Sequence, residues 1–153
     1  MSSWSTGRTF QAFASWVVIA DFQPSPYFTP PFLKDNQPLI GERAYQVLPM
    51  RALYDSGARV TLRSDWDVSP LSPLGIMQNA LSLGARGLPS LDAAIRAYTL
   101  RQEQDTGSLE VGKQADLLVL DRDIFESPIE QIGKARVLWT LLGGETTYRD
   151  AAF

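Results

Sequence analysis

Residues 107–121, GSLEVGKQADLLVLD, join two turn motifs to a short apolar run. Gly107-Ser108 and Gly112-Lys113 are typical of turns, because glycine adopts backbone conformations that other residues avoid. The apolar run that follows, residues 117–121, predicts a strand. Further strands are predicted at residues 136–142 and 145–148, joined by a tight turn at Gly143-Gly144. The last third of the chain is therefore predicted to be all-β.

Towards the N-terminus, short strand patterns alternate with helical patterns. The run Trp16–Ala20 is apolar and β-branched at its centre, which fits a strand covered on both faces. Arg59–Arg63 is a second candidate strand. Helices are predicted at residues 39–46, 50–56, 74–83 and 90–100, a long proline-rich loop at 23–38 and a frayed terminus at 1–9. The alternation is typical of βα units and predicts an α/β fold.

The composition excludes several kinds of function. The 153 residues contain no histidine and no cysteine, so this sequence cannot itself build a His-ligated zinc site, a Ser–His–Asp triad or a thiolate nucleophile. The formal net charge is −3, and without a basic run we expect no nucleic-acid partner. No run approaches the roughly 20 apolar residues that span a bilayer, so we expect no membrane partner and a cytoplasmic location. Residues 10–20 have some features of a signal-peptide core, but Gln11 and Ser15 interrupt it.

Polar residues gather where the second predicted strand ends, in Ser64-Asp65-Trp66-Asp67. The residues alone leave several interpretations open. Asp65 can pair with Arg63 or cap the following turn. Asp65 and Asp67, two residues apart, can share a strand face and together bind Mg²⁺ or Ca²⁺. Ser64 as a nucleophile would need a lysine base, for which the candidates are Lys34 and Lys113.

Three segments resemble the amidohydrolase superfamily. Residues 107–121 are similar to its G-S-L-x-x-G-K-x-A-D-L-x-V-L-D motif, which lies in a small β-sandwich beside a barrel. Ser64-Asp65-Trp66 resembles the G-S-D-W-P-V motif after the eighth barrel strand, and residues 17–24 resemble the seventh strand with its Q-P turn. The resemblance points to the branch of N-substituted formamide deformylases and related metal-dependent hydrolases.

The resemblance implies a fold and a chemistry. Residues 1–104 would form the C-terminal part of a TIM (β/α)8 barrel, its last two βα units, and residues 105–153 would add the β-sandwich strands. The activity implied is hydrolysis of C–N or ester-like bonds in a small amide or ester by metal-activated water. Relatives hold a zinc-like divalent metal through histidines that lie outside this chain, so we expect the chain alone to bind none.

The resemblance also implies roles for individual residues. Asp65 matches the aspartate after strand eight, which takes a proton from the attacking water or helps to hold the metal, so Asp65 is the candidate catalytic residue and a weak candidate metal ligand. Trp66, Ser64 and Gln23 are the candidate substrate-binding residues. Arg63 departs from the family pattern, because relatives have a glycine there.

A second function is also predicted from the same features. The chain is expected to be a fragment of a longer enzyme, and two parallel strands cannot close a barrel. Their unpaired edges expose backbone groups that can pair with another chain. The alternative to a hydrolase is therefore a non-catalytic oligomerising remnant or assembly module, which would form a homo-oligomer or bind an N-terminal partner chain.

Overall fold

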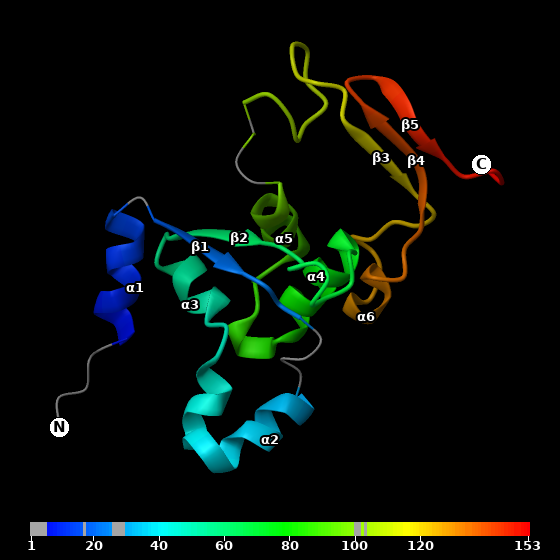
Figure 1. Cartoon of the computed structure of the whole chain (residues 1–153). Coiled ribbons are helices and arrows are strands. Elements are labelled where there is room, and N and C mark those ends of the chain that lie inside the picture. Colours follow the sequence, from blue (N-terminus) through cyan, green and yellow to red (C-terminus); the bar gives the residue numbers. More distant parts are fainter. Residues whose placement is uncertain (1–5, 17, 26–29, 100–101, 103) are drawn as a thin grey trace.

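The computed structural model describes residues 6–16, 18–25, 30–99, 102 and 104–153, and these form a mixture of helices and strands. In Figure 1 the strands fall into two groups, with β1 and β2 among the first helices and β3, β4 and β5 together at the far side from α1. In chain order the elements are α1 (Thr6–Ser15), β1 (Ile19–Phe22), α2 (Pro30–Ile40), the 3-10 helix η2 (Gly41–Gln46), α3 (Met50–Asp55), β2 (Arg59–Leu62), α4 (Pro73–Ser82), the 3-10 helix η3 (Gly84–Arg86), α5 (Leu91–Tyr98), β3 (Leu117–Leu120), α6 (Ile129–Ile132), β4 (Val137–Leu142) and β5 (Glu145–Arg149).

β1 and β2 pair in parallel, with Ala20 opposite Val60 and Asp21 opposite Thr61. Successive side chains of a strand point to opposite faces. Leu62 is 2% exposed and belongs to a buried cluster with residues of α3, α4 and α5, which also packs against Val60. The helices therefore cover the face that carries these apolar side chains. Asp21 and Thr61 lie on the opposite face, which we call the polar face.

The helices that cover the apolar face begin at well-defined caps. The Ser72 hydroxyl accepts a hydrogen bond from the Gly75 amide (3.1 Å) ahead of α4, and Pro73 occupies the first helical position. Both features favour a helix start, because the first amides of a helix have no partner within it. The Ser90 hydroxyl likewise accepts from the Ala93 amide (3.2 Å) ahead of α5. The sequence predictions for α3, β2, α4 and α5 are confirmed, and the observed ends of these elements lie within two residues of the predicted ones.

The first strand differs from its prediction. β1 covers Ile19–Phe22 rather than residues 16–20, and residues 6–9, which were predicted to fray, belong to α1. Phe10 and Phe13, three residues apart on α1, pack against a buried cluster that includes Leu53, so this helix has an apolar face to bury. The polar Asp21 lies within the strand. Residues 1–5 and Val17, to which part of these predictions applied, lie outside the described residues.

The proline-rich segment contains a helix, so the prediction of an irregular loop over residues 23–38 is wrong in its second half. α2 begins at Pro30-Pro31, where the missing amide hydrogens would have had no partner in any case. Pro38 lies close to the end of α2. The helix predicted over 39–46 is divided between the end of α2 and the 3-10 helix η2. Residues 26–29 lie outside the described residues.

β3, β4 and β5 form an antiparallel sheet, in which β4 and β5 make the predicted hairpin and β3 pairs with β4. Gly143 (φ 58°) and Gly144 (φ 86°) make the turn between β4 and β5, and two positive φ angles are what a tight hairpin turn requires. The Asp121 carboxylate accepts hydrogen bonds from the Arg122 side chain and from the side chain and amide of Arg136. These hydrogen bonds hold the pKa of Asp121 well below its ordinary value, and those from Arg122 have the largest effect.

The short helix α6 connects this sheet to the helical part, and its four residues gave no periodicity from which to predict it. Ile132 is 2% exposed, and the Gly133 amide donates to the Gln78 side-chain oxygen of α4 (2.8 Å). α6 therefore packs beside α4, as Figure 1 shows. The division into segments 1–104 and 105–153 stays a prediction. Among the described residues no helix has the length and apolar character needed to cross a membrane.

Candidate functional site

Polar side chains meet at the carboxyl ends of β1 and β2, on the polar face. The Thr61 hydroxyl donates to Asp21 Oδ1 (2.8 Å), and Arg63 Nε lies 2.5 Å from Asp21 Oδ2. The Arg63 amide donates to the Phe22 carbonyl (3.0 Å), which continues the pairing of the two strands past their last residues. Arg63 is therefore held at this edge of the sheet by both its main chain and its side chain.

The Arg63 guanidinium also contacts two further residues. Gln23 lies against it, and with the amide oriented so that its oxygen faces the guanidinium, that oxygen accepts from Nε and Nη2. Arg63 Nη1 lies 3.7 Å from Asp65 Oδ1, an ion pair longer than a direct hydrogen bond. We call Asp21, Gln23, Arg63 and Asp65 the Arg63 cluster. Of the interpretations left open by the sequence, pairing of Asp65 with Arg63 is the one that the structure contains.

The Arg63 cluster is partly open to solvent. The side chains of Asp21, Asp65 and Arg63 are 39%, 46% and 57% exposed. Ion pairs at this exposure contribute little to folding, since water screens the attraction. Asp65 has a positive φ of 56°, which aspartate tolerates better than most residues. Its carbonyl, not its carboxylate, accepts from the Val68 amide (2.7 Å) in the turn that follows.

The other predicted site residues have different surroundings. Trp66 is 68% exposed, whereas Ser64 is 7% exposed. Lys113, one of the two lysines considered as a base for Ser64, donates to the Ser108 hydroxyl (2.7 Å) in the turn before β3 and pairs with Glu110. The structure thus brings Gln23 to the residues around Asp65, which the sequence did not show, but it does not bring Lys113 there.

Three polar residues near the site were missed from the sequence. Asp21 and Thr61 bond each other across the sheet, which only the register of the strands reveals. Ser69, four residues after Asp65, is 3% exposed, and its hydroxyl oxygen has no hydrogen-bond partner among the described residues. A buried hydroxyl without a partner is uncommon in folded proteins.

The residues present do not fit a metal ion. Among the described residues no group of three or more carboxylates gathers closely enough to hold one. Asp65, which the sequence offered as a ligand either alone or with Asp67, lies beside the guanidinium of Arg63, and a divalent cation at Asp65 would be repelled by that charge.

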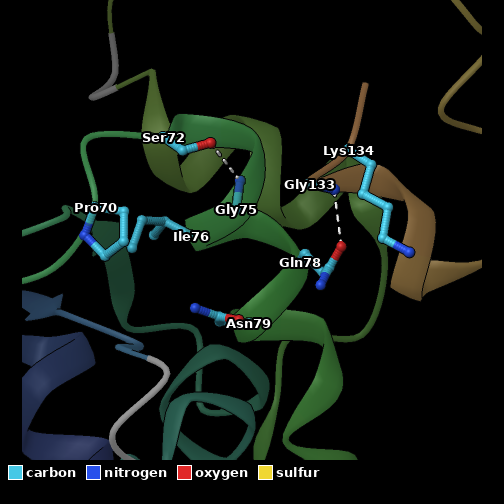
Figure 2. A pocket seen from close by; sticks show the side chains of 8 residues that line it. All are labelled: Pro70, Ser72, Gly75, Ile76, Gln78, Asn79, Gly133 and Lys134. Carbon is cyan, nitrogen blue, oxygen red and sulfur yellow. Dashed lines mark hydrogen bonds between the residues drawn. The ribbon is translucent and has the colours of Figure 1, made fainter. Parts of the chain in front are cut away.

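Cavities among the described residues also lie away from the Arg63 cluster, and the two described next include none of its residues. One, of about 190 Å³, lies between the start of α4 and the residues that follow α6 (Figure 2). Its wall includes the two hydrogen bonds drawn there, Ser72 with Gly75 and Gln78 with Gly133. The other, of about 340 Å³, lies between residues 81–91 and residues 124–132, with Arg51 at its wall. In both cavities, residues of the 70–91 segment form one side and residues of the 124–134 segment form the other.

The chain belongs to the amidohydrolase family, whose model matches residues 1–148. It is 34% identical to an N-substituted formamide deformylase of Arthrobacter pascens over 117 residues, which are 67% of this chain and 22% of the relative. It is 36% identical to an imidazolonepropionase of Bdellovibrio bacteriovorus over 93 residues, covering 57% of this chain and 22% of that protein. A probable imidazolonepropionase of Danio rerio is 30% identical over 76% of this chain and 30% of its own length.

A solved structure shows a similar fold. The crystal structure of a Xaa-Pro dipeptidase with bound methionine in the active site aligns with 95% of this chain and 34% of its own, at a TM-score of 0.51 and 20% sequence identity. The predicted α/β class and the predicted superfamily are therefore confirmed. The matched region is between about a fifth and a third of the length of these relatives.

Proposed function

We propose that this chain is one section of a hydrolase of the metal-dependent amidohydrolase type, which cleaves C–N or ester-like bonds of a small amide or ester. The observation that carries the proposal is the position of Asp65, directly after the carboxyl end of β2 in a chain of the amidohydrolase family. The names of the relatives suggest an N-substituted formamide as the first substrate to test.

In this proposal β1 and β2 are the last two strands of a (β/α)8 barrel. Their parallel pairing supports it, as does the crossover between them through α2 and α3. Helices cover one face of the pair, as they cover the outside of a barrel, and the polar groups of the other face meet at the carboxyl ends of the strands, where the sites of barrel enzymes lie. The remaining strands would come from residues outside these 153, in the same polypeptide or in a partner chain.

Asp65 is the proposed catalytic residue. A carboxylate accepts a proton from water that attacks a carbonyl, and the Asp65 side chain is 46% exposed, so water can reach it. Among the proposed substrate contacts, Trp66 presents the most surface, at 68% exposure. Gln23 already bonds Arg63 and Ser64 is buried, so their part in binding would be smaller.

The family is generally metal-dependent. Because Asp65 lies beside Arg63, we place no metal on this chain alone. A zinc-like ion would be held by ligands from the rest of the enzyme.

Replacing Asp65 with asparagine tests the proposal. The variant keeps the shape of the side chain but loses its basic carboxylate, so we expect kcat/KM to fall by about 100-fold or more. Hydrolysis of an N-substituted formamide and of an ester is measured in the whole enzyme that contains this section, with Zn²⁺, with Mn²⁺ and with EDTA. Glu145→Gln, which removes an exposed carboxylate on β5, is the matched control and should hydrolyse as the unmodified chain does. Hydrolysis unaffected by both EDTA and Asp65→Asn would contradict the proposal.

The second candidate function is assembly without catalysis. Among the described residues the β1–β2 sheet has a free edge on each strand. Ile19 on β1 and Trp16 just before it are 44% and 73% exposed. Free edges beside exposed apolar side chains favour pairing with another chain. We therefore expect light scattering to give the mass of a homo-oligomer. A folded chain that stays monomeric at every concentration, together with hydrolysis that depends on Asp65, would rule this candidate out.

A further inference from the structure

We propose that Arg63 occupies the cation position of this site, so that Asp65 binds no divalent metal ion while Arg63 is present. This inference goes beyond the proposed function, because it concerns which cation the carboxylates of this chain accept. It rests on the contacts of Arg63 and not on any hydrolysis.

Three side chains with oxygen atoms contact the Arg63 guanidinium. Asp21 and Asp65 supply carboxylate oxygens, and Gln23 supplies an amide oxygen. Carboxylate and amide oxygens are the ligands that Mg²⁺, Ca²⁺ and Mn²⁺ prefer. Here all three face one guanidinium, which satisfies them by hydrogen bonds and charge.

The Arg63 guanidinium contacts both carboxylates. Its Nε lies 2.5 Å from Asp21 Oδ2, and its Nη1 lies 3.7 Å from Asp65 Oδ1. A metal ion bridging Asp21 and Asp65 at the usual distance of about 2 to 2.6 Å would need the same space. Arg63 is anchored there by the hydrogen bond that its main-chain amide donates to the Phe22 carbonyl oxygen.

Arg63 also changes the net charge of the cluster. Two carboxylates carry −2, and Arg63 reduces the cluster to −1. Without Arg63 a divalent ion would neutralise the pair. With Arg63 in place, the same ion would meet a positive charge within a few ångströms and be repelled. The guanidinium therefore both fills the position and opposes its replacement.

Unfolding temperatures with and without MnCl₂ test this inference, with NaCl at equal ionic strength as the reference. We expect no Mn²⁺-dependent shift for the unmodified chain. The unfolding temperature of Arg63→Ala should rise by about 3 to 6 °C when the Mn²⁺ concentration is about tenfold above its dissociation constant. That shift should vanish in Arg63→Ala/Asp65→Asn. Arg59→Ala, which removes an exposed arginine at the other end of the same strand, is the matched control and should show none.

Three results would overturn the inference. The unmodified chain could show a shift that Asp65→Asn removes, so that metal and guanidinium coexist. Arg63→Ala could show no shift, so that Arg63 is not what keeps the metal away. The shift could persist in the double variant, so that the metal binds elsewhere. If Arg63→Ala does not fold, Arg63→Gln replaces it, because it removes the charge and keeps a polar side chain. The readout is independent of hydrolysis, so failure here and failure of the proposed function are distinguishable.

Discussion

Replacing Gly87 with alanine should destabilise the chain by about 3 kcal/mol, although it adds a single methyl group. A Cβ at this position would lie 2.4 Å from the Ala80 carbonyl oxygen and 3.2 Å from that of Leu81, both main-chain atoms at the end of α4. Main chain cannot move aside as a side chain can. The Ala80 carbonyl also accepts a hydrogen bond from the Leu88 amide (3.0 Å). Moving this carbonyl would break the bond that holds the segment after η3 against α4.

Thermal unfolding measures this effect, with an expected fall in Tm of about 6 to 12 °C. Gly75→Ala is the matched control, because a Cβ there would meet only the Ser72 side chain, at 3.2 to 3.3 Å. The helix propensity of alanine offsets that tight contact, so its Tm should change little. Equal destabilisation by the two variants would show that α4 and η3 do not pack as described.

Truncating Leu62 to alanine should destabilise the chain by a similar amount, about 3 kcal/mol. Leu62 is the last residue of β2, is 2% exposed, and packs in the cluster that joins the sheet to α3, α4 and α5. Its removal leaves a cavity beneath the carboxyl end of β2, next to Arg63 in the chain. Loss of this packing should therefore loosen the edge of the sheet that carries the site.

Urea unfolding of Leu62→Ala measures the change, through the midpoint at constant slope. Leu118→Ala is the matched control, since Leu118 also lies in a four-residue strand but is 60% exposed. The control should change stability by about 0.5 kcal/mol or less. A Leu62→Ala variant as stable as Leu118→Ala would contradict the buried position of β2.

The elements that could be predicted from the sequence are those with local signals. Ser90 caps α5 and Gly143-Gly144 makes the hairpin turn, and both act within a few residues. The predicted position of β1 is wrong because Asp21 interrupts the apolar pattern. Thr61 and Arg63, which pair with Asp21, lie about 40 residues further along the chain. α2 was missed because prolines usually end helices, and here two of them begin one.

The same distinction holds for the site. The position of Asp65 after a strand follows from its own neighbours in the sequence. The Arg63 cluster could not be predicted, because it depends on the register that places Asp21 opposite Thr61, and hence beside Arg63. Parallel strands bring their carboxyl ends to one edge only after a long crossover, and no local pattern specifies that register.

The parallel pairing of β1 with β2 is the premise of the site, and a disulfide tests it directly. The sequence contains no cysteine, so an introduced pair has no competitor. Ile19 and Arg59 are register partners and both are exposed. Neighbouring strands lie about 4.8 Å apart, within reach of a disulfide. Mild oxidation of Ile19→Cys/Arg59→Cys should therefore give an intramolecular disulfide in the monomer, seen by mass and gel mobility. Ile19→Cys/Arg63→Cys should not, because its two positions are four residues out of register. The reverse result, cross-linking in the second pair and not the first, would indicate antiparallel strands and contradict the account.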